Sequence, residues 1–155
     1  MRDEEYLRLP HGMFDRDKEW IKKERNILDN HATMGERIGC RLKKYSPLSH
    51  ASTFIRGART AENKVYTLTS KTGKSLILSS DSTPSVFRKY VTSSNGEAQR
   101  VAFVAPLFRY RNSHSRHFTQ IGYSIINERK DEGALDINLI QLAKTMTDLF
   151  KAQRD

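Results

Sequence analysis

The clearest hydrophobic pattern in the sequence is a helical stripe between residues 16 and 39. Its apolar positions recur at three- and four-residue spacing among lysines and glutamates, and they are Trp20, Ile27, Leu28, Met34 and Ile38. This spacing predicts one long amphipathic helix, and Gly39 supplies its stop signal. The same spacing after Asp136, a plausible capping residue, predicts a terminal helix. Its apolar face consists of Leu139, Leu142, Ala143, Met146, Leu149 and Phe150.

Between these helices, β-branched and aromatic residues favour two antiparallel hairpins. The first pairs residues 64–69 with 75–80 across a polar connection, and the second pairs residues 100–111 with 117–127. A short helix is expected between the hairpins, with Thr83 as its cap and Pro84 where no N–H donor is needed. Its apolar face would consist of Val86, Phe87, Tyr90 and Val91. This order of elements predicts an α+β domain in which helices flank an antiparallel sheet.

The 155 residues suit a single domain with its own hydrophobic core. The only cysteine, Cys40, cannot form an intramolecular disulfide, so we expect it to be a buried apolar residue in a reducing, cytoplasmic setting. No apolar run reaches the roughly 18 residues that a membrane helix requires, and the first ten residues lack the apolar segment of a signal peptide. We therefore expect no membrane partner.

Positive charge is concentrated at the turn of the second hairpin. Lys and Arg outnumber Asp and Glu by 27 to 18, and this excess favours phosphate-bearing partners, although it could serve solubility alone. Alternation places Arg109 and Arg111 on one face of a strand, where two guanidinium groups could share a polyphosphate. Phe118 on the return strand could stack on a base. The competing interpretation is an exposed turn whose charges are only solvated.

The stretch FRYRNSHSRHFTQIG, residues 108–122, resembles the second signature of class II aminoacyl-tRNA synthetases. That signature is an Arg on one strand, followed after a loop by Arg or His, three residues and Phe. Arg109, His114 and Phe118 fill these places. Gln120 and Gly122 match the histidyl-tRNA synthetase group, which includes the catalytically inactive regulatory subunit of ATP phosphoribosyltransferase.

The resemblance extends over roughly residues 9–150. The upstream run LSSDSTPSVFR resembles the hairpin end and the following helix of that group through Asp81, Thr83 and Arg88. Pro47 lies at the place of the proline in the dimer-forming first signature. The sequence DSTP, residues 81–84, and Thr119 resemble the regulatory branch more than the enzymes.

The resemblance implies a role for each matched residue. Arg109 would be the catalytic residue, which holds the α-phosphate of ATP or of an adenylate. Phe118 would lie under adenine, and the other residues implied to bind ATP are Arg111, His114 and Arg116. The residues implied to bind an amino acid, chiefly through its α-ammonium, are Asp81, Thr83, Gln120 and Ser124. ATP is the implied cofactor, and Mg²⁺ is a candidate companion ion.

Several features depart from the family enzymes. Arg111 stands where they carry Glu, and Ser124 replaces the Glu that selects the histidine ring. No third signature and no anticodon-binding domain is recognisable before Asp155. We therefore expect a truncated class II core that binds ATP or an adenylate, with an amino acid as a further ligand, and that lacks full aminoacylation activity.

Two alternatives remain open. The first is a noncatalytic regulatory subunit that resembles the one of ATP phosphoribosyltransferase in histidine biosynthesis. The second is plain RNA binding by the basic surface, which predicts an affinity that collapses with salt. In either synthetase-like interpretation the first-signature likeness implies a homodimer, or a partner chain that completes the site, and tRNA is a candidate partner.

Overall fold

The computed structural model of the chain describes residues 8–57, 65–110 and 115–128. The predicted terminal helix at 136–150 lies outside these residues, as do Arg111 and His114. The chain divides into two compact units that are each assembled from separate stretches. Unit 1 comprises Met1–Asp15, Lys44–Lys89 and Ala105–Gln120, and unit 2 comprises Arg16–Lys43, Tyr90–Val104 and Ile121–Asp155. The expectation of a single domain stays a prediction.

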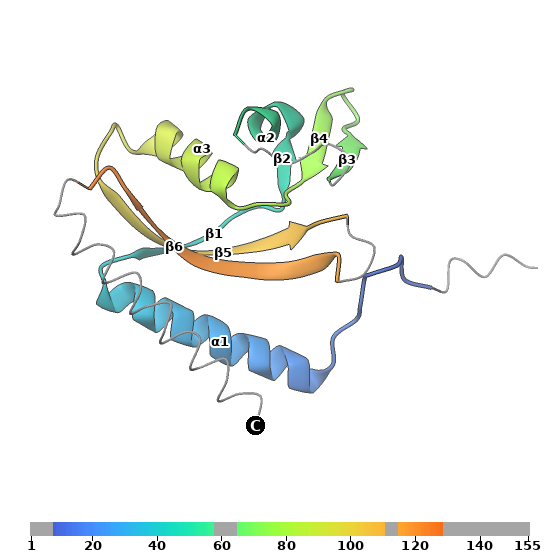
Figure 1. Cartoon of the computed structure of the whole chain (residues 1–155), viewed down its shortest axis with the longest axis horizontal. Coiled ribbons are helices and arrows are strands. Elements are labelled where there is room, and N and C mark those ends of the chain that lie inside the picture. The colour runs from blue at the N-terminus through green and yellow to red at the C-terminus, as the bar shows by residue number, and fades with distance from the viewer. Residues whose placement is uncertain (1–7, 58–64, 111–114, 129–155) are drawn as a thin grey trace, which may run out of the picture. The chain divides into compact units, whose positions relative to one another are not determined.

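Unit 2 is built around the long amphipathic helix that the sequence predicts. This helix, α1, spans Lys18–Arg37, and the Asp17 carboxylate caps it by accepting from the Trp20 N–H at 2.8 Å. Glu19 in its first turn and Arg37 in its last turn complement the helix dipole. Its buried positions are His31 and Gly35, and α1 runs along the β5 and β6 residues of the same unit (Figure 1).

Three strands form the first sheet, in the order β1, β5, β6. They span Arg41–Lys44, Gln99–Phe108 and His117–Ile126. The core of unit 2 includes Val101, Ala102 and Phe103, together with Cys40, which is buried as expected. Burial raises the pKa of the Cys40 thiol, so this side chain behaves as a small apolar residue.

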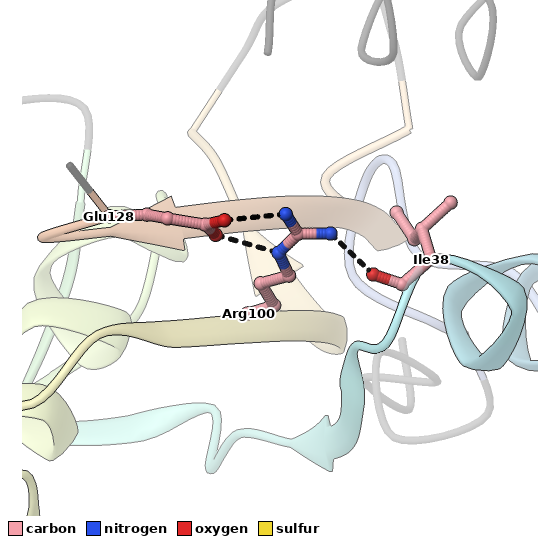
Figure 2. Close-up of polar contacts among 3 residues, drawn as sticks. All are labelled: Ile38, Arg100 and Glu128. Atoms are coloured by element: carbon pink, nitrogen blue, oxygen red, sulfur yellow. Dashed lines mark hydrogen bonds and ion pairs between the residues drawn. The ribbon is translucent and has the colours of Figure 1, made fainter. Parts of the chain in front are cut away.

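An ion pair links three segments of unit 2 (Figure 2). Arg100 donates from Nε and Nη2 to the two carboxylate oxygens of Glu128, and from Nη1 to the Ile38 carbonyl. Ile38 is the C-cap of α1, so the guanidinium also places positive charge at the end of the helix where the dipole favours it.

Unit 1 contains the second sheet, in which β4 lies between β2 and β3. The strands are β2 (Leu48–His50), β3 (Tyr66–Thr69) and β4 (Ser75–Leu78), and both pairings are antiparallel. The helix α2 (Ala51–Gly57) packs against β2 and β4. The fold class expected from the sequence is confirmed, but the two predicted hairpins lie in two three-stranded sheets rather than in one.

The helix α3 spans Thr83–Ser93, one residue earlier than a Thr83 cap would place it. Its first hydrogen bond runs from the Val86 N–H to the Ser82 carbonyl, and the Asp81 carboxylate accepts from the Thr83 N–H. The prediction of its apolar face is wrong at two positions, because Phe87 and Val91 are 54% and 76% exposed while Val86 is buried. Among the described helices, none is long and apolar enough to cross a membrane.

Candidate functional site

The residues of the predicted nucleotide site gather in unit 1, at the base of the β5–β6 hairpin. Arg109 follows β5 directly, and its backbone N–H donates to the Arg116 carbonyl at 2.9 Å. The Arg109 side chain donates from Nε to the Ser80 carbonyl at 2.7 Å. Ser80 precedes Asp81, so this bond ties the predicted phosphate-binding residue to the segment that carries the predicted ammonium-binding residue.

Arg109 and Phe118 lie on the same side of the hairpin. The guanidinium carbon of Arg109 is 5.2 Å from the centroid of the Phe118 ring, within the range of a cation–π contact. The guanidinium and the ring therefore face each other directly, with no gap between them that a purine could enter. Because the guanidinium already lies over the ring, a purine between the two would first have to separate them.

The Arg109 contacts leave part of the guanidinium available for an anion. An arginine carries five N–H donors, and only Nε has a hydrogen-bond acceptor among the described residues. The two terminal nitrogens form the planar fork that suits phosphate oxygens. The Ser80 bond fixes the base of this fork, so less side-chain freedom remains to be lost when an anion binds.

A loop at residues 79–82 holds the second half of the candidate site in place. The Ser79 N–H donates to the Pro47 carbonyl at 2.7 Å, and the Ser79 carbonyl accepts from the Phe108 N–H at 2.8 Å. The loop is thus anchored both to the chain before β2 and to the end of β5. Asp81 is half-buried and one of its oxygens accepts from the Thr83 N–H at 2.9 Å, whereas Thr83 is exposed.

Gln120 lies two residues after Phe118 on β6, and alternation along a strand puts both side chains on the same face. Its amide oxygen is buried and has no hydrogen-bond partner among the described residues. The remaining amino-acid residue of the prediction, Ser124, is a half-buried residue of β6 in unit 2. The structure therefore brings Arg109, Phe118 and the 79–82 loop together within unit 1. Arg111 and His114 lie outside the described residues, so their predicted roles stay predictions.

Arg116 contributes a second contact between a cation and a ring. Its guanidinium lies 4.2 Å from the centroid of the Tyr110 ring, and Tyr110 meets Tyr66 of β3 edge-on at 5.8 Å. The Arg116 N–H also donates to the Gly12 carbonyl at 2.8 Å, which attaches the N-terminal segment to the hairpin. Sequence reasoning missed Gly12, Tyr66 and Tyr110. Of these three, only Tyr110 could have been recognised from the sequence, because it is an aromatic residue between two arginines.

The electrostatics of this region are positive, with one carboxylate. Arg109 and Arg116 flank the hairpin base, and Asp81 is the acidic residue of the loop beside them. In the part of the chain that the structure describes, no three His, Cys, Asp or Glu side chains come together as a metal site would require. The arrangement suits a ligand with an anionic group for the arginines, a flat ring for Phe118 and a cationic group for Asp81.

Comparison with known proteins gives a consistent picture. The family model described as Histidyl-tRNA synthetase matches residues 12–154. A histidine–tRNA ligase of Pseudothermotoga lettingae is 30% identical over 99 residues, which cover 60% of this chain and 22% of that protein. One of Dictyoglomus turgidum is 34% identical over 86 residues, which cover 52% of this chain and 20% of that protein. The chain thus spans about a fifth of the length of these curated relatives.

Solved structures agree on the fold. A protein of Bacillus halodurans described as an ATP phosphoribosyltransferase regulatory subunit/histidyl-tRNA synthetase superposes with a TM-score of 0.80 at 21% identity, over 92% of this chain and 38% of that one. The apo histidyl-tRNA synthetase of S. aureus gives a TM-score of 0.74 at 21% identity, over 90% and 33%. The chain belongs to the histidyl-tRNA synthetase family, and its fold is that of a class II synthetase-like core.

Proposed function

We propose that the domain binds ATP or an adenylate, together with an amino acid, at the base of the β5–β6 hairpin. The observation that carries this proposal is the position of Arg109, whose guanidinium lies over the Phe118 ring while its Nε is held by the Ser80 carbonyl. An anion-binding fork beside an aromatic face matches the two chemically distinct parts of an adenosine phosphate.

Each group of the site has a distinct part in this proposal. ATP supplies the activated phosphate when it is bound. Arg109 would hold the α-phosphate through its terminal nitrogens, where it would stabilise charge that develops as the amino-acid carboxylate attacks the α-phosphorus and pyrophosphate leaves. Phe118 offers its ring face to adenine, either on the side away from Arg109 or after the guanidinium moves toward the phosphate. Asp81 and Gln120 receive the ammonium of the amino acid.

Two sequence features favour binding without full aminoacylation. Ser124 stands where the family enzymes carry the Glu that selects histidine, and it offers no negative charge to a histidine ring. Arg111 reverses the charge at a position where the family carries Glu. In this proposal Mg²⁺ would enter with the phosphates of ATP.

The direct test is isothermal titration with AMP and ATP, followed by pyrophosphate exchange with each of the common amino acids. Arg109→Ala should weaken AMP binding, because it removes charge-assisted bonds to phosphate. Arg41→Ala, an exposed change on β1, is the matched control and should leave binding unchanged. Wild-type protein that binds neither nucleotide would refute the proposal.

A noncatalytic regulatory subunit is the second candidate function. The observation that favours it is the likeness, over 92% of this chain, to the structure described as an ATP phosphoribosyltransferase regulatory subunit/histidyl-tRNA synthetase. In this case the site would sense a metabolite and a partner chain would respond. Ligand binding without amino-acid-dependent pyrophosphate exchange would support this function over the first.

A further inference from the structure

The sheet of unit 1 has one apolar face that is partly open to solvent. The strand pairings place two rows of side chains on this face. The first row consists of Leu48, Leu78 and Tyr66, and the second row consists of His50, Leu76 and Leu68. Leu48 and Leu68 are each 44% exposed, and the other three apolar residues are half-buried. The five apolar residues of these rows are called the leucine face below.

The opposite face of the same sheet is closed at its centre. Alternation along the strands gives this face the row between the other two, which consists of Ser49, Ile77 and Thr67. Ile77 is only 3% exposed, and the Ser49 hydroxyl lies 3.3 Å from the hydroxyl of buried Ser79. In an antiparallel sheet with one solvated face, the solvated face normally carries the polar residues. Here the more apolar face is the open one, which is typical of an interaction surface.

Positive charge lies at one end of the leucine face. The turn between β3 and β4 carries Lys71 and Lys74, and both are exposed. The Ser70 N–H donates to the Lys74 carbonyl, and the Lys74 N–H donates to the Ser70 hydroxyl, both at 2.9 Å. These bonds fix the turn, so the two lysines follow directly after the second row of the face.

The other end of the leucine face borders the β5–β6 hairpin. Tyr66 meets Tyr110 edge-on at 5.8 Å, and the Arg116 guanidinium lies 4.2 Å from the centroid of the Tyr110 ring. Residues 41–57 and 65–80, which include all three strands of this sheet, contain no Asp and no Glu. The leucine face therefore has basic groups at both ends and no acidic residue on its strands.

These features favour one kind of occupant. A second copy of the chain is disfavoured, because each copy has a net charge of +9 and the two would bring like charges together. Three strands extend over about 10 Å, since neighbouring strands lie ~4.8 Å apart. A helix with its side chains is about 10–12 Å wide. A single amphipathic helix therefore fits across the sheet.

We propose that the leucine face is a docking surface for an acidic amphipathic helix of another protein. The apolar side of that helix packs on the leucines, and its carboxylates lie near Lys71, Lys74 and Arg116. No residue of the leucine face belongs to the proposed nucleotide site, so this inference does not depend on the proposed function.

The probe for this inference is a fluorescein-labelled synthetic peptide of about 18 residues, or five helical turns, with leucine on one side and glutamate on the other. Fluorescence anisotropy measures its binding to the full chain. A peptide of the same composition in shuffled order has no apolar side, and a third peptide carries lysine in place of glutamate. We expect the acidic amphipathic peptide to bind about tenfold or more tightly than either control, and to bind more weakly as salt is added.

Substitutions on the chain locate the binding surface. Leu48→Ser and Leu68→Ser each remove apolar area, and Lys71→Glu combined with Lys74→Glu reverses the charge at one end. Each of these three variants should weaken binding about fivefold or more. Leu42→Ser is the matched control, because Leu42 is 52% exposed but lies on β1 in unit 2, and it should bind as the wild type does. The lysine variant changes only exposed side chains of the turn, so it tests the proposal even where a leucine variant is unstable.

Four results would overturn the proposal. The first is a wild type that does not bind the acidic peptide, and the second is equal binding by the wild type, the two leucine variants and the lysine variant. The third is a dimer in solution that Leu68→Ser dissociates, which would mean that a second copy covers the face. The fourth is binding to vesicles of phosphatidylcholine and phosphatidylglycerol that is lost in Leu68→Ser, which would assign the face to an anionic membrane.

Discussion

Arg100→Ala is the substitution whose effect on stability follows most directly from the geometry. Arg100 donates at 2.6 Å from Nε and at 2.6 Å from Nη2 to the Glu128 carboxylate, and at 2.8 Å from Nη1 to the Ile38 carbonyl (Figure 2). The side chains of Arg100 and Glu128 are 26% and 12% exposed. The guanidinium thus joins the start of β5, a residue two positions after the end of β6 and the C-cap of α1.

The free-energy cost of Arg100→Ala should lie between the values typical of exposed and of fully buried ion pairs. Exposed ion pairs contribute about 0.2–1 kcal/mol, while removal of one partner from a fully buried pair costs about 3–5 kcal/mol. The pair here is bidentate but a quarter of the arginine side chain is in contact with solvent, so we expect roughly 2 kcal/mol. Loss of the bond to the Ile38 carbonyl adds about 0.5–1 kcal/mol. A total near 2.5 kcal/mol corresponds to a fall in Tm of roughly 5–10 °C for a chain of this length.

Urea and thermal unfolding of Arg100→Ala, Glu128→Ala and the double variant form a double-mutant cycle that isolates the pair. The cycle should give a coupling free energy of about 1–2 kcal/mol, and Arg100→Lys should recover only part of it because an ammonium cannot bind the carboxylate in the bidentate geometry. Arg41→Ala on the exposed face of β1 controls for loss of a positive charge. A change below about 0.5 kcal/mol for Arg100→Ala would refute this reasoning.

Three further predictions concern the α1 contacts of unit 2. Burial lowers the pKa of His31 although its Nε2 donates to the Phe103 carbonyl, so the folded state favours the neutral imidazole. The contribution of His31 to the free energy of unfolding should therefore be full above pH 6.5 and fall as the pH drops below that value. His31→Phe should flatten this dependence in urea titrations at a series of pH values. Gly35→Ala should destabilise by about 1–3 kcal/mol in thermal unfolding, because its new Cβ would lie 2.6 Å from the Ala102 Cβ; unchanged stability would show that the helix can shift outward. Burial raises the pKa of Tyr123 to about 12, so this phenol should not contribute to the ultraviolet titration near pH 10, and Tyr123→Phe should leave that region of the curve unchanged.

Periodic elements were predictable because each is determined by its own residues. The stripe from Trp20 to Ile38 predicts α1 to within about two residues at either end, and the β-rich runs predict both hairpins. The assignment of both hairpins to one sheet was not determined in this way. Besides β3, β4 also pairs with β2, and that second pairing depends on the fold of residues 45–50 rather than on a local pattern.

The site was predictable only as a set of residue types. Resemblance to the second signature gave Arg109 and Phe118, whereas alternation along the strand was used only to put Arg109 and Arg111 on one face. The bond from Arg109 to the Ser80 carbonyl could not be foreseen, because a backbone acceptor leaves no trace in the identity of the residue that carries it. The exposure of Phe87 and Val91 was missed because hydrophobic periodicity identifies an apolar face but not whether another element covers it.

The central claim is that Arg109 and Phe118 together bind an adenosine phosphate, and AMP titration of the wild type against Arg109→Ala and Phe118→Ala tests it most directly. Loss of the charge-assisted phosphate bonds should weaken AMP binding by about 10- to 100-fold in Arg109→Ala. Loss of base stacking should weaken it by about fivefold or more in Phe118→Ala. Adenosine, which lacks the phosphate, should bind the wild type weakly and be affected by Phe118→Ala but little by Arg109→Ala. AMP affinity that is equal in all three proteins would contradict the claim.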